Sequence, residues 1–240
     1  MSELFLKGVS LRELPPAGSY LNDLPVVRYL AGVPLLPFTA PVTFLVGENG
    51  TGKSTLIEAL AVSWGFNAEG GSRDHMFSTR DSHSELYSLI ALARSLHKPR
   101  DGFFLRAESF YNTASYLEET STMRRYGGKS LHSQSHGEAF LSLVVNRFIG
   151  GGLYLLDEPE AALSPQSILS LIRAVDELVK ADAQFIIATH SPILMAYPNA
   201  KILQFTESGI EQVGYRDTEH YRLTKQFLDD PERMMKYLLD

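Results

Sequence analysis

The sequence predicts an α/β fold built on a central, mainly parallel sheet, with a helical lobe attached to it. Three short apolar runs carry this prediction, at residues 42–46, 153–156 and 185–188. Such runs are typical of strands that are buried on both faces, as the strands of a parallel sheet are. Each run stops at a glycine or at polar residues, and helical patterns follow the first two, which is the alternation of strand and helix typical of α/β proteins.

The length and composition fit one globular domain. The chain has 240 residues, of which 44% are hydrophobic and 21% are charged, enough for one sizeable core. We therefore expect a single domain over residues 1–240, in which residues 66–150 form a mainly helical lobe. The chain has no apolar run long enough for a membrane span and no basic-then-apolar N-terminus, so we expect a cytoplasmic protein without membrane insertion. The absence of cysteine excludes disulfides, thiol catalysis and cysteine-ligated metals.

The N-terminal part is expected to open the fold with two strands. The first lies within residues 4–14, and the second is the run at residues 42–46. Residues 24–38 are rich in proline and leucine, and we expect them to form an irregular connection between the two strands.

A glycine-rich segment, GENGTGKST at residues 47–55, follows the second strand. It matches the phosphate-binding pattern G-x-x-x-x-G-K-[ST] and stands between a strand and a helix, as that pattern requires. The glycines allow a tight turn whose N–H groups surround a polyphosphate. Lys53 adds a positive charge for the outer phosphates, and the Ser54 hydroxyl is a candidate Mg²⁺ ligand. The alternative is a glycine-rich turn with an incidental lysine. The predicted phosphate-binding residues are Asn49, Gly50, Thr51, Gly52, Lys53, Ser54 and Thr55.

The next stretch, residues 66–130, is expected to be mainly helical, with one helix over residues 84–97 and one strand that begins at Phe103. It leads to the segment Ser135, His136, Gly137 and Glu138, which precedes a strongly apolar helical pattern at residues 139–148. A serine and a glycine at a helix start offer a hydroxyl and free N–H groups to an anion. The other interpretation is a helix capping box formed by Ser135 and Glu138. The two interpretations are compatible, because the cap geometry presents the donors.

Two acids follow the apolar run at residues 153–156. Carboxylates at the C-terminal end of a buried parallel strand lie beside the phosphate-binding loop, so Asp157 is a candidate Mg²⁺ ligand. Glu158, one residue further on, is a candidate general base that polarises an attacking water. The alternative is a pair of surface acids after a strand.

The next helix and strand bring a histidine toward these acids. Ser164 and Pro165 mark a helix start, and its expected buried stripe is Ile168, Leu171, Ile172, Val175, Leu178 and Val179. The strand at residues 185–188 follows, and His190 comes two residues after it. There His190 could hydrogen-bond a γ-phosphate and Glu158; taken alone, it would more often be a structural histidine. Residues 202–205 and 210–213 are expected to form a closing hairpin, and residues 218–240 one or two terminal helices.

In these segments and their order, the chain resembles the ABC-type ATPase heads, and among them the RecF- and SMC-like branch that includes small stand-alone bacterial proteins labelled "AAA family ATPase". The resemblance makes residues 47–55 the Walker A loop, Asp157 and Glu158 the catalytic Walker B pair, and His190 the catalytic switch histidine. The signature S-G-G-Q corresponds to residues 135–138, with His136 where a glycine is usual. Glu108 stands where many relatives carry the Q-loop glutamine, which makes it a candidate Mg²⁺ ligand; a surface acid after an edge strand is the alternative.

The resemblance also implies ATP and Mg²⁺ as cofactors and a homodimer that sandwiches two ATP molecules. The signature segment of one subunit would then complete the ATP site of the other, so Ser135, His136, Gly137 and Glu138 would act in trans. A monomer would bind ATP but hydrolyse it poorly.

The sequence is compatible with three hypotheses for the process that ATP hydrolysis drives. Only residues 71–130 are net positive, with 9 Lys and Arg against 7 Asp and Glu, and tyrosines lie between the basic residues, a mixture that suits DNA or RNA. A solvated lobe with balanced charges is the alternative. A nucleic-acid-maintenance or defence ATPase is therefore one hypothesis, an ATP-dependent switch that binds a protein partner is the second, and the ATPase subunit of an ABC transporter is the third.

Overall fold

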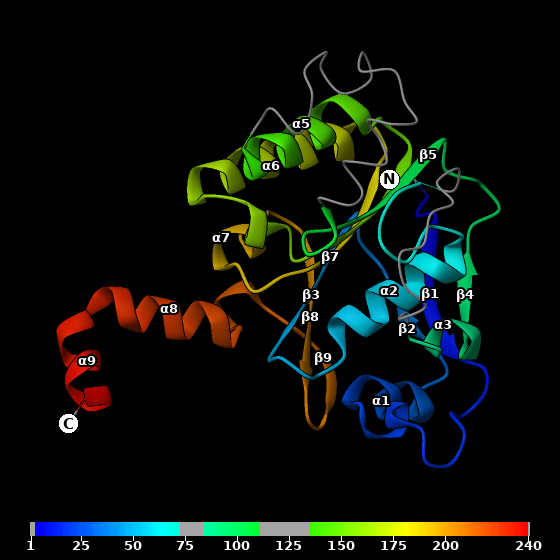
Figure 1. The fold of residues 1–240 in the computed structure, drawn as a ribbon, viewed down its shortest axis with the longest axis horizontal. Helices are drawn as coiled ribbons and strands as arrows, with labels where there is room; N and C mark the ends of the chain where they lie inside the picture. Colours follow the sequence, from blue (N-terminus) through cyan, green and yellow to red (C-terminus); the bar gives the residue numbers. More distant parts are fainter. Residues whose placement is uncertain (1–2, 73–83, 111–134, 240) are drawn as a thin grey trace.

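The computed structural model describes residues 3–72, 84–110 and 135–239. Its centre is a six-stranded sheet in the order β5-β6-β7-β3-β8-β9 (Figure 1). The first five strands of that order are parallel and β9 pairs antiparallel with β8, so the predicted α/β fold with a mainly parallel sheet is confirmed. The strands are β3 (Val42–Gly47), β5 (Asp101–Arg106), β6 (Gly152–Asp157), β7 (Gln184–Ala188), β8 (Lys201–Thr206) and β9 (Gly209–Val213).

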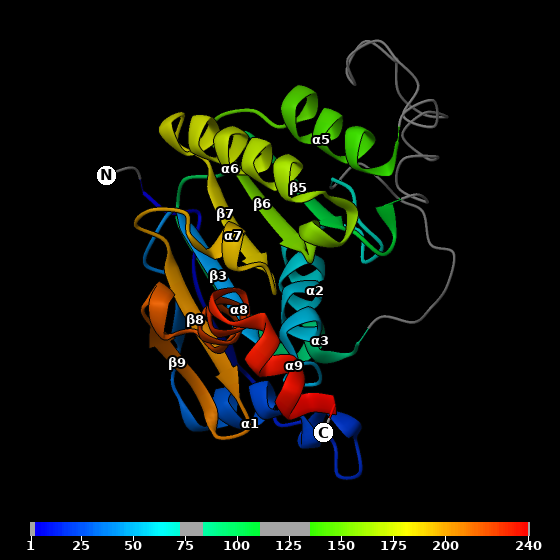
Figure 2. The same ribbon diagram turned by 90° about the vertical axis from the view of Figure 1, so that its left-hand side faces the viewer.

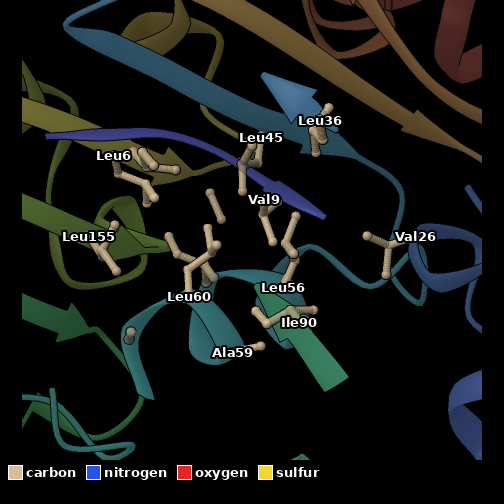
Figure 3. Packing of buried hydrophobic residues seen from close by; sticks show 14 of the residues in the cluster. Leu6, Val9, Val26, Leu36, Leu45, Leu56, Ala59, Leu60, Ile90 and Leu155 are labelled. Carbon is tan, nitrogen blue, oxygen red and sulfur yellow. The ribbon is translucent and has the colours of Figure 1, made fainter. Parts of the chain in front are cut away.

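A second, smaller sheet lies beside the first. Its strands β1 (Leu6–Leu11), β2 (Leu36–Pro37) and β4 (Ile90–Arg94) pair antiparallel in the order β2-β1-β4. The small sheet and helix α2 (Lys53–Trp64) share one hydrophobic core with one face of the central sheet. In that core Leu56 and Leu60 of α2 point toward Val9 of β1 and Leu45 of β3 (Figure 3).

The other face of the central sheet is covered by helices. These are α5 (His136–Arg147), α6 (Pro165–Lys180) and the short α7 (Pro192–Met195), and α5 and α6 lie side by side in both views (Figures 1 and 2). Neighbouring residues of a strand serve opposite faces: Phe103 belongs to the core under α5 and α6, and Phe104 to the core around α2. Side chains alternate along a strand, and both faces of the sheet are covered, so the strands are buried on both sides. The apolar runs in the sequence predicted this.

One buried side chain ties the two sheets together. Gln184, the first residue of β7, is 1% exposed. Its Oε1 accepts from the backbone N–H of Leu6 at 2.9 Å, and its Nε2 donates to the Leu6 carbonyl at 2.7 Å. The amide therefore satisfies two backbone groups of β1 that face the central sheet.

Two predictions for the N-terminal half are wrong. Residues 24–38 are not irregular: they contain helix α1 (Pro25–Gly32) and strand β2. Proline occupies the first helical position, and Val26, Val27 and Leu30 are buried on one face, so the proline here starts a helix instead of breaking one.

Residues 84–97 do not form one helix either. The helix α3 covers only Leu86–Leu89, and the chain continues as strand β4, which pairs with β1. A run such as Ile90 to Arg94 fits either structure locally, and the partner strand β1 decides it. The described part of the predicted helical lobe thus contains the strands β4 and β5 and the helices α3 and α5.

The C-terminal segment leaves the body of the molecule. After a short 3-10 helix at Tyr215–Asp217, helices α8 (Glu219–Asp229) and α9 (Pro231–Leu239) extend away from the central sheet (Figure 1). Both are amphipathic, yet neither contains a buried residue. In the part of the chain that the structure describes, no helix is long and apolar enough to span a membrane.

Candidate functional site

The predicted site segments meet at one edge of the central sheet. Strands β6, β7 and β3 are parallel neighbours, so their carboxyl ends lie together. The register places Asp157 of β6 beside Ala188 of β7, and Ala188 beside Leu45 of β3. The loop after β3, the acids Asp157 and Glu158 at the end of β6 and the histidine after β7 therefore share this edge, where ligands bind in open α/β sheets.

The loop between β3 and α2 has the backbone of a phosphate cradle. Gly47 and Gly52 have φ angles of 140° and 93°, and a Cβ would approach the Phe205 carbonyl oxygen to 2.3 Å at Gly47 and a Val26 methyl to 2.4 Å at Gly52. Only glycine fits both positions. Gly52 caps α2 without a side chain, so the N–H groups of the first helical turn are left for an anion.

The lysine of this loop is buried. The Nζ atom of Lys53 donates to the carbonyl oxygens of Gly47 at 2.7 Å and Glu48 at 2.9 Å. Burial lowers the pKa of Lys53, while Glu158 and Asp157 oppose this shift. Lys53 is thus held inside the loop that would surround a polyphosphate, beside the acids that follow β6.

Asp157 is the centre of a buried polar cluster. Its Oδ1 accepts from the Ser54 hydroxyl and its Oδ2 accepts from Nε of Arg106, each at 3.1 Å. Arg106 also donates from Nη1 to Glu58 Oε2 at 2.8 Å. Burial raises the pKa of Asp157 to about 6, against the opposing effect of Arg106 and Ser54.

Sequence reasoning missed Arg106 and Glu58. Arg106 is the last residue of β5 and stands directly opposite Asp157 in the strand register. The sequence did contain one signal for Arg106, a basic residue at the end of an expected strand and two residues before Glu108. Its pairing with Asp157 becomes visible only once β5 and β6 are known to be neighbours.

The predicted metal ligands are brought together in part. Ser54 and Asp157 line a cavity of about 260 Å³ with Glu158, His136 and Arg106, and a hydroxyl with a carboxylate suits Mg²⁺, which takes one or two carboxylates and the oxygens of phosphates and water. Among the described residues, no three His, Cys, Asp or Glu side chains are grouped to hold a metal alone. Glu108 lies on the rim of the same cavity, with its side chain 89% exposed and 3.9 Å from Nε of Arg106.

Glu158 and His190 face each other across the end of β6 and β7. Glu158 has a left-handed backbone with φ 50°, and its N–H donates to the Ala188 carbonyl at 2.9 Å. Its Oε1 lies 3.5 Å from Nε2 of His190, a buried atom without a hydrogen-bond partner among the described residues. Glu158 is one of three non-glycine residues with positive φ among those described, and the unpartnered Nε2 of His190 leaves that nitrogen available to a ligand.

A third acid, Glu160, was not predicted. It lies in the 3-10 helix Pro159–Ala162 and accepts a hydrogen bond from the backbone N–H of His190. Burial raises the pKa of Glu160, and the bond from His190 opposes that shift. Glu160 therefore fixes the backbone of His190 at the site.

The segment before α5 forms the predicted capping box. The Ser135 hydroxyl accepts from the Glu138 N–H, and Glu138 Oε2 accepts from the Ser135 N–H at 3.0 Å. A Cβ at Gly137 would meet the Ala162 carbonyl oxygen at 2.8 Å, so the glycine lets α5 approach the segment after Glu158. Ser135 and His136 are exposed, and the His136 ring packs edge-on against Phe110, with the centroids 5.2 Å apart. Of the segment, His136 alone lines the cavity beside Ser54.

Most of the basic and aromatic residues predicted to contact nucleic acid lie outside the described residues. They are Arg73, His75, Arg80, Tyr111, Tyr116, Arg124, Arg125, Tyr126 and Lys129. Two described ones have local contacts: the Arg94 guanidinium lies 4.6 Å from the centroid of the Trp64 ring, and His97 Nδ1 lies 2.6 Å from Glu3.

Two family models match the chain. The one described as "AAA domain, putative AbiEii toxin, Type IV TA system" matches residues 130–196, and the one described as "AAA domain" matches residues 28–99. The first covers the residues from before Ser135 to beyond His190, and the second covers the loop that contains Lys53.

The chain is also similar to curated proteins and to solved structures. The "Ribose import ATP-binding protein RbsA 1" of Agrobacterium fabrum is 28% identical over 192 residues, which cover 69% of this chain and 36% of that protein. This chain therefore spans about a third of the length of the curated relatives it matches.

Among solved structures, cbiO1 from Clostridium perfringens, described as part of the ABC transporter complex cbiONQ, has a TM-score of 0.52 at 18% identity. The match covers 96% of this chain and 99% of that one. The SMC head domain from Thermotoga maritima has a TM-score of 0.46 at 16% identity, over 88% of this chain and 98% of its own. The likeness to cbiO1 shows that the two chains share a fold.

Proposed function

We propose that this chain, an ABC-type ATPase domain of the AAA class, binds ATP with Mg²⁺ and hydrolyses it as an ATP-sandwiched homodimer. The matches to AAA models and to ribose import ATP-binding proteins support the ATPase class. The observation that carries the proposal is the convergence of Lys53, Glu158 and His190 at the carboxyl edge of the sheet. In this proposal residues 1–240 act as one ATPase domain, and residues 66–150 form the lobe that bears the signature segment.

The phosphate-binding residues have distinct roles in this proposal. Residues 49–55 surround the β- and γ-phosphates with backbone N–H groups, and Lys53 leaves the loop carbonyls to contact the outer phosphates. Ser54 and Asp157 would hold Mg²⁺, with Glu108 reaching it from the rim of the cavity. The ion supplies positive charge that offsets the charge developing on the transferred phosphoryl group.

Hydrolysis is assigned to Glu158 and His190. Glu158 accepts a proton from a water as the water oxygen bonds to the γ-phosphorus and the bond between that phosphorus and the bridging oxygen of ADP breaks. Nε2–H of His190 donates to the γ-phosphate on one side and faces Glu158 on the other. Glu158 is half-exposed and lines the cavity, which leaves room for the attacking water.

The partner copy supplies the signature segment. Ser135 and Gly137 lie outside the lining of the cavity that contains Ser54 of the same chain, and Ser135 is exposed at the start of α5. The free N–H groups at that helix start are suited to a γ-phosphate, and so is the Ser135 hydroxyl once it turns away from Glu138 Oε2, which it contacts at 2.7 Å. We therefore assign the segment Ser135, His136, Gly137 and Glu138 to the ATP that the other subunit holds, although His136 also lines the cavity of its own chain.

Turnover measured across protein concentrations tests the proposal. Specific ATPase activity is expected to rise with protein concentration, because a complete site needs two chains. Glu158→Gln should keep ATP binding and form an ATP-dependent dimer with turnover reduced at least a hundredfold, since the general base is lost. Lys53→Ala, as the matched control, should lose ATP binding and the dimer together. Normal turnover by Glu158→Gln would overturn the catalytic assignment, and constant specific activity would overturn the dimer.

For the process that hydrolysis drives, we propose nucleic-acid maintenance or defence in the cytoplasm, with DNA or RNA bound by the net-positive residues 71–130. Turnover stimulated by DNA or RNA, with stimulation lost at higher salt, is the expected result. Absence of both binding and stimulation would overturn this coupling and leave the ATPase intact.

Two other couplings have specific observations in their favour. An ATP-dependent protein-binding switch is favoured by the exposed apolar side chains of α8 and α9. The ATPase subunit of an ABC transporter is favoured by the likeness to ribose import ATP-binding proteins. ATP-dependent capture of a protein would support the first, and co-purification with a membrane protein would support the second.

A further inference from the structure

A second histidine contacts His190 from the C-terminal helices. Nε2 of His220 lies 2.9 Å from Nδ1 of His190, and the two rings meet edge-on with centroids 5.0 Å apart. His220 is the second residue of α8, a segment that no predicted role included. The pair joins the ATP site to the helices that extend from the body of the molecule.

The chemistry of the site fixes which nitrogen carries each proton. Nε2 of His190 faces the Glu158 carboxylate at 3.5 Å and, in the proposed function, the γ-phosphate. Both are anionic acceptors, so this nitrogen must carry the proton, and a neutral His190 then accepts at Nδ1. The only donor that the structure places at Nδ1 among the described residues is the Nε2–H of His220.

Burial favours two neutral rings. Burial and the nearby charge of Lys53 lower the pKa of His190, and burial lowers the pKa of His220. In a neutral pair the bond from His220 holds His190 in one tautomer and one ring orientation, as the outer partners of functional histidines do. Without that donor, His190 could place its proton on Nδ1 and present a lone pair to the two anions.

The start of α8 is the firmly held end of the C-terminal segment. Thr218 is fully buried, donates to the Tyr215 carbonyl at 2.8 Å and accepts from the Tyr221 N–H. Beyond this point α8 and α9 contain no buried residue. The contact between His220 and His190 and the ring pair of Tyr221 and Tyr215, with centroids 4.7 Å apart, are therefore among the few contacts that fix α8 relative to the body.

We propose that His220 is a positioning residue for His190 and that, through this bond, the ATP state of the site controls how firmly the arm, residues 218–239, is held against the body. The proposal rests on the proposed function, because it needs ATP at the site. When the γ-phosphate accepts from Nε2–H of His190, the acceptor strength of Nδ1 rises and the bond from His220 strengthens, as linked hydrogen bonds do. After phosphate leaves, the bond weakens and the arm is released.

Hydrogen exchange measured with and without ATP and Mg²⁺ tests the proposal. In the Glu158→Gln background, ATP should slow exchange in residues 47–58 and slow exchange in α8 at least fivefold. Adding His220→Leu, which removes the donor, should abolish the effect on α8 and leave the effect on residues 47–58. His220→Gln, whose amide N–H can replace the imidazole donor, should restore it. His97→Leu is the matched control, since it removes an exposed histidine whose contact is with Glu3.

Activity gives a second readout. In the presence of Glu158, His220→Leu should lower kcat about tenfold with little change in KM, as loss of an outer hydrogen-bond partner does, while His220→Gln stays within about threefold of the parent. Equal protection of α8 in the parent and in a folded His220→Leu variant, or no rescue by His220→Gln, would overturn the role of His220 alone. Absence of ATP protection at residues 47–58 would overturn ATP binding itself and the proposal with it.

Discussion

At the scale of single residues, three acids that are close in the sequence have three different environments. Asp157 is 3% exposed and bonded to Ser54 and Arg106. Glu158 is half-exposed on a left-handed backbone and faces His190. Glu160 is held under the backbone of His190. Differences in burial and in hydrogen-bond partners therefore suit the three acids to different roles, as in other sites with neighbouring carboxylates.

Ser135 combines two functions that a pair of substitutions can separate. Ser135→Ala removes the cap of α5 and should lower the free energy of unfolding by about 1 kcal/mol. Ser135→Asp keeps a cap, but its carboxylate lies where the serine hydroxyl contacts Glu138 Oε2 at 2.7 Å. Repulsion between the two carboxylates offsets the cap, so the loss of unfolding free energy should also be about 1 kcal/mol. In the proposed dimer, however, the aspartate would repel the γ-phosphate in trans, so turnover should fall about a hundredfold. Urea unfolding and steady-state turnover measure the two effects, and an active Ser135→Asp variant would contradict the signature role.

At the scale of elements, the arrangement of the two sheets is specified by few polar contacts. The side chain of Gln184 is the buried amide that satisfies the backbone of Leu6. Gln204, on the neighbouring part of the same sheet, is also buried, yet its Oε1 has no partner among the described residues. The same residue type thus has a structural role in β7 that it lacks in β8.

This difference predicts unequal effects of one substitution. Gln184→Leu leaves the N–H and the carbonyl of Leu6 unsatisfied and should lower the free energy of unfolding by about 2–4 kcal/mol. Gln204→Leu replaces an amide with an unpartnered oxygen and should change it by less than about 1 kcal/mol. Urea unfolding of both variants checks the comparison, and equal losses would contradict the proposed link between the sheets.

At the scale of the whole molecule, the site is assembled from segments far apart in the chain. Loop 47–55, strand β5, strand β6 and the turn after β7 contribute side chains to one edge, and α8 reaches it from the C-terminal end. The stability of the folded body is therefore coupled to charges at this edge, most directly through buried Asp157.

The raised pKa of Asp157 makes the stability of the nucleotide-free protein depend on pH. Its pKa is 3.8 in an unstructured chain and about 6 when folded, so between these values the folded state holds a proton that the unfolded state has released. The free energy of unfolding should therefore contain a contribution that decreases as pH rises from about 4 to about 6 and is constant above.

Asp157→Asn removes this contribution. The unfolding free energies of parent and variant, measured in urea from about pH 4 to pH 7, should differ in slope over the lower part of that range. Other titrating groups, including Glu160, His190 and His220, occur in both proteins and cancel in the difference. Parallel curves would contradict the raised pKa.

The sequence by itself determined the local features of this protein. The glycine loop, the capping box at Ser135 and the helix start at Ser164 were predictable because their signals lie within a few residues of each other. The buried strands were predictable because both faces of a parallel strand are apolar, and the order of these motifs carried the resemblance to ABC-type ATPase heads.

Only the tertiary structure decided the features that depend on distant partners. Residues 84–97 contain a strand because β1 pairs with them. Arg106 acquires a role because β5 lies beside β6, and His220 because α8 begins next to His190. The physical reason is the same in each case: such contacts join residues tens of positions or more apart, and their energy depends on packing and burial that no local pattern encodes.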